Sequence, residues 1–183
     1  MKKFSVKTIV AIGIGAALFF VLGRFVAIPS PVPNTNISLQ YAVLGLLAAM
    51  YGPIAGGLIG FIGHTLIDLS WGGSPWWSWV IASAFVGVVV GLFANKLRLN
   101  EGEFGTKGIA TFSIANVVAN LGAWVVIAPV LDILIYAEPK DKVFAQGALA
   151  FVANVIIIAI LGTLLGVAYS KIGAKNSGLR KED

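Results

Sequence analysis

Apolar residues fill long runs of this chain, and only short polar segments separate them. The pattern predicts six membrane-spanning helices, near residues 7–28, 37–51, 53–71, 76–95, 107–136 and 143–171. About 20 apolar residues are enough to cross a hydrocarbon core of ~30 Å. The second run is short and Pro53 follows it closely, so we expect the second and third helices to form a tight hairpin. A five-span alternative merges residues 37–71 into one helix, which is too long for an ordinary span.

The polar segments leave no room for a separate soluble domain. The longest are residues 96–107 and 172–183, so we predict one all-α membrane domain over residues 1–183. The first apolar run is longer than the roughly 7–15 residues of a signal-peptide core, and we do not expect it to be cleaved.

Composition and charge support a membrane protein and predict its orientation. Hydrophobic residues make up 58% of the chain and charged residues 11%, whereas a soluble domain carries about 25% charged residues. The absence of cysteine excludes disulfide and thiol chemistry. With six spans, ten basic residues lie on one side of the membrane and three on the other, so we predict that both termini are cytoplasmic. The ten are Lys2, Lys3, Lys7, Lys96, Arg98, Lys107, Lys171, Lys175, Arg180 and Lys181, and the three are Arg24, Lys140 and Lys142.

Glycine recurs every four residues on the predicted third helix, and the same stripe becomes polar toward one end. Gly52, Gly56 and Gly60 are followed by His64 and Asp68. Residues four apart share a helix face, and small residues allow helices to approach closely in lipid. We therefore interpret the glycines as a surface for helix packing.

Polar residues on the predicted helices gather toward the side opposite the termini. Buried polar groups in a membrane cost free energy unless they are paired, and single Asn or Ser residues can simply hold helices together. Because these positions cluster in the outer half, we predict a ligand cavity that opens outward rather than a pore. They are His64, Asp68, Asn120, Trp124, Asp132, Gln146 and Asn154.

Two loops on the predicted outer side suit ligand binding. Residues 27–41 read AIPSPVPNTNISLQY, and their prolines stiffen the loop. Residues 70–79 read SWGGSPWWSW, which we interpret as an aromatic flap hinged at Gly72 and Gly73. An interfacial belt of tryptophans is the alternative, although a belt normally occupies both interfaces.

Binding is the predicted activity, with no catalytic residues and no metal ligands. One histidine beside one aspartate is too few for a zinc site, and no GxxxxGK[ST] phosphate loop occurs. His64 and Asp68 could instead relay protons in a secondary transporter, or Asp68 could pair with Arg24. The candidate ligand contacts are Asn34, Asn36, Gln40, Tyr41, His64, Asp68, Trp71, Trp76, Trp77, Asn116, Asn120, Trp124, Gln146 and Asn154.

The chain resembles the S-components of energy-coupling-factor (ECF) vitamin transporters over nearly its whole length. The likeness begins with KTIVAIGIGAALFFVLGRF at residues 7–25 and includes the proline- and asparagine-rich loop. It continues through the hairpin YGPIAGGLIGFIGH at residues 51–64 and WWSWVIASAFVGVVVGL at residues 76–92. The chain is most similar to the riboflavin-type and uncharacterised group, and within it to the S-component for cobalamin.

This resemblance implies the substrate-binding subunit of an importer in a bacterial plasma membrane. Such subunits bind a vitamin outside, dock on a membrane coupling subunit driven by two ATPases, and topple so that the pocket faces inward. The chain itself then needs no cofactor, because ATP and magnesium belong to the partner ATPases. The family docks through an Ala-x-x-x-Ala patch on the first helix, whose counterparts here are Ala11 and Gly15, with Gly13 and Ala17 beside them.

Several substrates and two other classes of protein stay open. Cobalamin is the first candidate, because it is large, mostly neutral and rich in amides and ring surface, and riboflavin follows because its planar ring would stack on tryptophan. The scarcity of Arg and Lys on the outer side argues against a phosphorylated ligand. The other classes are a proton-coupled secondary transporter and a structural or assembly membrane protein without a ligand.

Overall fold

The computed structural model describes residues 5–179, with side chains to residue 172, and it is almost entirely helical. Lys2, Lys3, Arg180 and Lys181, and the side chain of Lys175, lie outside the described residues. The elements are α1 (Val6–Phe25), β1 (Ile28–Pro29), β2 (Asn36–Ile37), α2 (Gln40–Tyr51), α3 (Pro53–Ser70), α4 (Trp77–Leu92), α5 (Ala94–Leu97), the 3₁₀ turn η1 (Leu99–Glu101), α6 (Thr106–Asn120), the π-helical η2 (Leu121–Ile127), α7 (Ala128–Tyr136), α8 (Lys140–Ile157), the π-helical η3 (Ile158–Gly162) and α9 (Thr163–Leu179).

Four helical segments in the described residues are long and apolar enough to cross a membrane, which supports an all-α membrane protein. They are Val6–Phe25, Pro53–Ser70, Thr106–Tyr136 and Lys140–Ile172, and a fifth results if Trp77–Leu92 and Ala94–Glu101, bent by 47°, form one span. The predicted count of six is not confirmed. It requires both the bent pair and α2, whose 12 residues extend only about 18 Å at 1.5 Å per residue.

The predicted hairpin between the second and third helices is confirmed. Gly52 ends α2 and precedes α3, with φ of 87° and ψ of −177°, a conformation that is essentially confined to glycine. Pro53 then begins α3, where its missing N–H is not needed. The chain therefore breaks at Gly52, and the merged five-span alternative is wrong.

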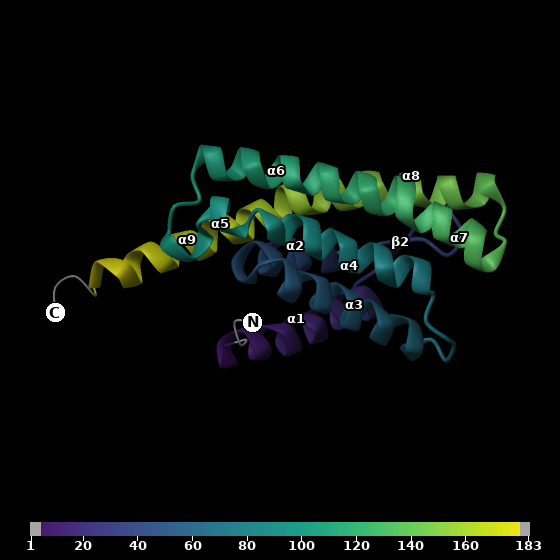
Figure 1. Ribbon diagram of the computed structural model, residues 1–183, viewed down its shortest axis with the longest axis horizontal. Helices are drawn as coiled ribbons and strands as arrows, with labels where there is room; N and C mark the ends of the chain where they lie inside the picture. Colours follow the sequence, from purple (N-terminus) through teal and green to yellow (C-terminus); the bar gives the residue numbers. More distant parts are fainter. Residues whose placement is uncertain (1–4, 180–183) are drawn as a thin grey trace.

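The two ends of the bundle differ in what they carry. Helix α1 begins and α9 ends at the left in Figure 1, whereas the α3–α4 and α7–α8 loops lie at the right. The start of α1, helix α5 and the start of α6, which contain Lys7, Lys96 and Lys107, lie toward the left, and the start of α8, which contains Lys140, lies at the right, as does the loop that follows Arg24 at the end of α1. This separation agrees with the predicted charge asymmetry, and the assignment of the left-hand end to the cytoplasm stays a prediction.

Glycines let α3 and α4 approach each other closely, in agreement with the packing surface predicted on the third helix. A Cβ atom added at Gly56 would collide with the carbonyl of Gly87, and one added at Gly60 would lie 2.5 Å from the carbonyl oxygen of Ser83. One helical turn beyond Gly60 on the same stripe, His64 bonds to Ser83. The packing stripe therefore leads directly to the polar end of the bundle.

Candidate functional site

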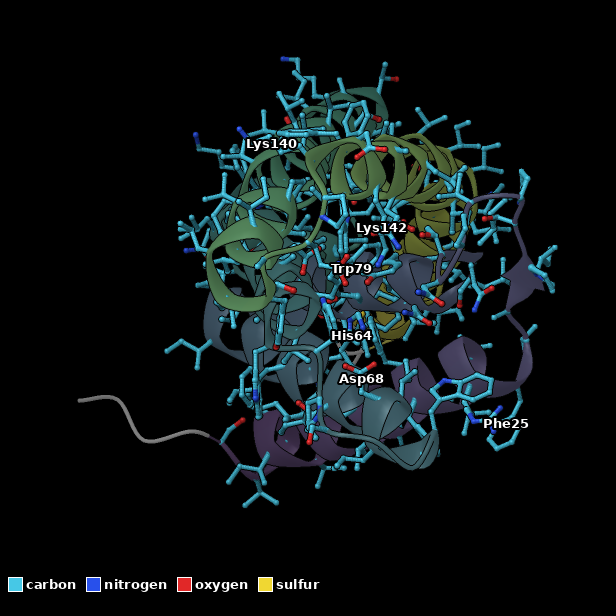
Figure 2. All side chains as sticks on the ribbon, turned by 90° about the vertical axis from the view of Figure 1, so that its right-hand side faces the viewer. Phe25, His64, Asp68, Trp79, Lys140 and Lys142 are labelled. Carbon is cyan, nitrogen blue, oxygen red and sulfur yellow. The ribbon has the colours of Figure 1, made fainter. Side chains whose placement is uncertain are left out.

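Two adjoining cavities, of about 380 and 520 Å³, lie at the loop end of the bundle. Figure 2 looks onto this end and shows His64, Asp68, Trp79 and Lys142 grouped near its centre. The two cavities are adjacent because they share part of their lining, namely Asn34, His64, Asp68, Trp71 and Trp79. Their walls combine indole rings, amides and carboxylates, which is the composition of a site for a small organic molecule.

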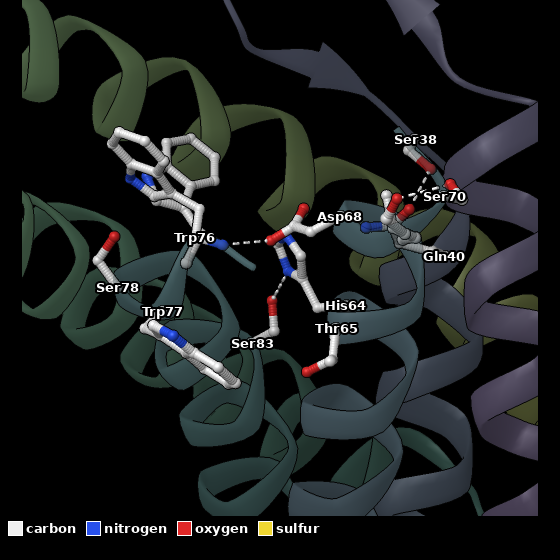
Figure 3. A network of polar contacts seen from close by, with 12 residues as sticks. Ser38, Gln40, His64, Thr65, Asp68, Ser70, Trp76, Trp77, Ser78 and Ser83 are labelled. Atoms are coloured by element: carbon white, nitrogen blue, oxygen red, sulfur yellow. Dashed lines mark hydrogen bonds and ion pairs between the residues drawn. The ribbon is translucent and has the colours of Figure 1, made fainter. Parts of the chain in front are cut away.

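A chain of hydrogen bonds crosses the floor of the larger cavity. The Ser83 hydroxyl lies 2.6 Å from His64 Nδ1 and 2.8 Å from the hydroxyl of Tyr41. Because Ser83 has a single proton, all three groups are satisfied when Tyr41 donates to Ser83 and Ser83 donates to His64 Nδ1. His64 then carries its proton on Nε2, which faces Asp68 Oδ1 at 3.7 Å. Figure 3 shows the Ser83–His64 part of this chain beside Asp68.

Asp68 connects this floor to the α3–α4 loop. Its Oδ2 accepts a 2.8 Å hydrogen bond from the backbone N–H of Trp76 (Figure 3). Its Oδ1 lies beyond hydrogen-bonding distance of His64. Asp68 lines both cavities, and 17% of its side chain is exposed. One oxygen of Asp68 is thus available to a ligand.

Asp132 of α7 holds the aromatic wall of the smaller cavity. It is buried, and it accepts hydrogen bonds from the indole N–H groups of Trp76 (2.6 Å) and Trp79 (2.9 Å) and from the hydroxyl of Ser78. The Trp76 ring also stacks on Tyr136, with 4.0 Å between ring centroids. Two tryptophans of the α4 N-terminus are therefore fixed against α7, and the predicted flap is fastened at Trp76.

The β1–β2 loop lies over the other side of the cavities. Within it, the Ser30 hydroxyl donates to the carbonyl of Thr35 at 2.6 Å, and Gln146 Nε2 of α8 donates to the carbonyl of Pro33 at 2.8 Å. Asn34 has a positive φ of 57°, which asparagine tolerates better than most residues. This conformation places Asn34 in the lining of both cavities.

The structure brings most of the predicted ligand contacts together and leaves three of them elsewhere. Those that line a cavity are Asn34, Asn36, Gln40, Tyr41, His64, Asp68, Trp71, Trp76, Trp124, Gln146 and Asn154. Trp77, Asn116 and Asn120 do not line either cavity. Their assignment as ligand contacts therefore has no geometric support, and each has another partner.

Trp77 points away from the cavities, and the two asparagines bond inside the bundle. Trp77 is 41% exposed and stacks on Phe61. Asn120 accepts from the Trp124 indole at 2.9 Å and donates to Asn116 Oδ1 at 2.7 Å, while Asn116 donates to the carbonyl of Val155 at 3.0 Å. The asparagines thus link η2, α6 and α8, which is the helix-joining role that the sequence left open.

The expected pairing of Asp68 with Arg24 is wrong. The guanidinium of Arg24 instead lies over the ring of Trp71, 3.7 Å from its centroid. Asp132 does not pair with a basic residue either, because its oxygens are occupied by indole and hydroxyl donors. The aromatic residues, which the sequence presented as ligand contacts, therefore also serve as partners for the charged groups.

Ten lining residues were missing from the predicted ligand contacts, and Trp79, Glu138 and Lys142 are the ones whose side chains add an aromatic ring or an ion pair to the walls. Trp79 lines both cavities, although the sequence offered only the repeated tryptophans of the loop as a signal. Glu138 and Lys142 line the smaller cavity and form an ion pair at 2.6 Å. Their four-residue spacing could have indicated the pair, but not its place at the cavity.

The small residues of α1 divide between two faces. Ala11 and Gly15 are buried against the bundle, and a Cβ atom at Gly15 would lie 2.7 Å from Leu47 and 2.8 Å from Ile59. Gly13 and Ala17 are exposed, and nothing lies within 4 Å of a Cβ atom added at Gly13. Of the four predicted docking residues, Ala11 and Gly15 therefore lack the exposure that a partner helix needs, whereas Gly13 and Ala17 have it.

Comparison with known proteins places the whole chain in one group. A family model described as "ECF-type riboflavin transporter, S component" matches residues 3–171. A UPF0397 protein of Exiguobacterium sp. is 53% identical over 182 residues, covering 100% of both chains. UPF0397 proteins of Streptococcus gordonii and Enterococcus faecalis are 55% identical over 98% of this chain and 96% of the relative, and 50% identical over 99% of both.

Proposed function

Because the chain belongs to the family of ECF-type riboflavin transporter S components, we propose that it captures a vitamin-sized molecule in the two adjoining cavities and delivers it across a bacterial plasma membrane. The observation that carries this proposal is the joining of the two cavities by shared aromatic and polar walls. Each volume falls in the range of about 300–1,000 Å³ that is typical of sites for small organic ligands. The family is one of substrate-binding subunits, so we assign the chain no reaction.

Transport requires partners in this proposal. The chain docks on a transmembrane coupling subunit whose two ATPases supply the energy, and the exposed stripe of α1 around Gly13 and Ala17 is the contact surface. Small residues on a lipid-facing helix allow a second helix to approach its backbone closely. ATP and magnesium are held by the ATPases, and the chain itself carries no cofactor.

Riboflavin is the substrate that the geometry supports best. Its isoalloxazine ring suits the indole faces of Trp71 and Trp79, its polar edge and ribityl chain suit the amides, and the cavities are of its scale. Cobalamin is the second candidate, favoured by the number of amide side chains, among them Gln40, Gln146 and Asn154. Because cobalamin is several times larger, the β1–β2 and α3–α4 loops would have to withdraw to admit it.

The test is direct binding to the protein purified in detergent. Riboflavin is measured by quenching of its fluorescence and cobalamin by calorimetry, and mass spectrometry identifies any small molecule that copurifies. Saturable binding of riboflavin without heat from cobalamin supports the first candidate, and the reverse result supports the second. Binding of neither, with no small molecule retained, contradicts the proposal.

A further inference from the structure

We propose that Asp68 determines the charge class of the ligand. Its carboxylate accepts a hydrogen bond from an N–H group, or pairs with a cationic nitrogen, of a ring-containing ligand. The same carboxylate repels the anionic form of that ligand. This inference rests on the proposed function and extends it from a binding site to a selection rule. It depends on how the charged groups around the cavities are already paired.

The charges that line the cavities are mostly negative. Asp68, Asp132 and Glu138 carry carboxylates, and Lys142 is the basic residue among the lining residues. The Lys142 ammonium lies 2.6 Å from Glu138, which neutralises both. An anionic ligand thus meets no unpaired cation in the lining of either cavity.

Other candidate counter-ions near the cavities do not change this balance. Arg24 lies outside the lining residues, with its guanidinium on the ring of Trp71. His64 is not a permanent cation, and a neutral imidazole that accepts from Ser83 on Nδ1 presents its Nε2–H toward Asp68 at 3.7 Å. The negative charge of Asp68 is therefore not cancelled by an ion pair with a permanent cation.

Asp68 differs from Asp132 in having an oxygen to offer. Asp132 is fully engaged by two indoles and a hydroxyl and is 2% exposed. Asp68 receives one backbone N–H on Oδ2, while Oδ1 stands 3.7 Å from His64, and the residue lines both cavities. A carboxylate oxygen in a partly buried site bonds strongly to a donor or a cation, and it repels an anion more strongly than it would in water.

The test compares ligands that differ in charge. One pair is riboflavin and riboflavin 5′-phosphate. The other is cyanocobalamin and a derivative in which one side-chain amide is hydrolysed to a carboxylate, which changes the charge with almost no change in size. We expect the wild-type protein to bind the neutral member of the relevant pair at least ~30-fold more tightly. In Asp68→Asn the ratio should fall to within about threefold, because the amide oxygen can still accept the Trp76 N–H but the charge is gone.

The matched control is Asp141→Asn. Asp141 lies in the first turn of α8 at the same end of the bundle, is exposed, and does not line either cavity. Solvent screens its charge, so its removal should leave the ratio at the wild-type value. Asp68→Ser provides a second neutral variant if Asp68→Asn does not fold.

Two outcomes would overturn the inference itself. Equal binding of the two members of a pair by the wild-type protein shows that the cavity does not select by charge. A wild-type ratio that persists in Asp68→Asn or Asp68→Ser shows that selection depends on size or on another residue. Failure of both neutral ligands to bind is a different result, because it removes the proposed substrates and with them the premise of the inference.

Discussion

The indole nitrogens of Trp76 and Trp79 reach one carboxylate from neighbouring turns of the α4 N-terminus. Asp132 is 2% exposed, so its charge is stabilised almost entirely by these two N–H groups and the Ser78 hydroxyl. The carboxylate in turn fixes the orientation of both rings, and these rings line the smaller cavity. A residue that does not need to touch the ligand can therefore set the shape of the site.

We predict that Asp132→Asn weakens ligand binding at least ~10-fold, or ~1.4 kcal/mol. The amide oxygen can still accept from one indole, but the amide NH₂ opposes the N–H of the other. Calorimetry on the purified variant measures the effect. Trp77→Phe is the control, because Trp77 is 41% exposed and stacks on Phe61 away from the cavities. Wild-type affinity in Asp132→Asn would show that the two rings do not need this carboxylate.

Asn120→Leu should act mainly on stability. It leaves the Trp124 indole and the Asn116 amide without their shared partner, at a cost of about 1–2 kcal/mol. We expect a lower melting temperature in detergent, with ligand affinity reduced less than in Asp132→Asn. An unchanged melting temperature together with lost binding would instead make Asn120 a ligand contact.

Helix α1 has two apolar faces, of which one packs against α2 and α3 and the other is exposed. Gly15 lies against Leu47 of α2 and Ile59 of α3, whereas Gly13 has open space around it. Neighbouring exposed residues such as Ile9, Val10 and Ile14 are large and apolar. In a bilayer this surface faces lipid or a partner helix, and only its small residues permit close approach of a backbone.

Gly13→Leu should therefore affect uptake, whereas Gly15→Leu should affect stability. We predict that Gly13→Leu abolishes uptake by cells that contain the coupling subunit and ATPases, while the purified variant keeps its melting temperature and ligand affinity. Gly15→Leu should lower the free energy of unfolding by about 1–3 kcal/mol, because the added side chain overpacks the contact between α1 and α3. The variant should therefore melt at a lower temperature. Uptake at the wild-type level in Gly13→Leu would remove this stripe from the docking surface.

At the scale of the whole molecule, the cavities lie at one end and glycine packing closes the rest of the α3–α4 pair. Backbone contacts at Gly56 and Gly60 leave no passage between these two helices on the side of His64 that is farther from the loops. A ligand bound at the loop end therefore has no path to the other side between α3 and α4. Movement of the whole subunit by a partner, as in the proposed function, does not depend on such a path.

Uptake should consequently depend on the partner ATPases. We predict that proteoliposomes containing this chain alone bind substrate but do not accumulate it, and that adding the coupling subunit, the ATPases and ATP restores accumulation. The measurement is retained radiolabelled substrate over time, with a hydrolysis-deficient ATPase as control. Accumulation driven by a pH gradient without ATPases would revive His64 and Asp68 as a proton relay in a secondary transporter.

Features that depend on local periodicity and backbone conformation could be predicted from the amino-acid sequence. Apolar runs predicted the helices, Gly52 and Pro53 predicted the hairpin, and the four-residue glycine stripe predicted the packing of α3. The gathering of His64, Asp68, Gln146 and Asn154 at one end followed from topology. These inferences succeeded because helix period and chain reversal are properties of short segments.

The side of each helix that faces the bundle could not be predicted from the sequence and is known from the packing of the helices. In a membrane, the face that meets lipid and the face that meets other helices are both apolar, so hydrophobic periodicity does not distinguish them. Ala11 and Gly13 are two residues apart and thus on nearly opposite sides of α1, yet the sequence offered both as docking residues. Similarly, the sequence does not distinguish Trp77 from Trp79, and the structure shows that Trp79 lines both cavities and donates to Asp132 of α7.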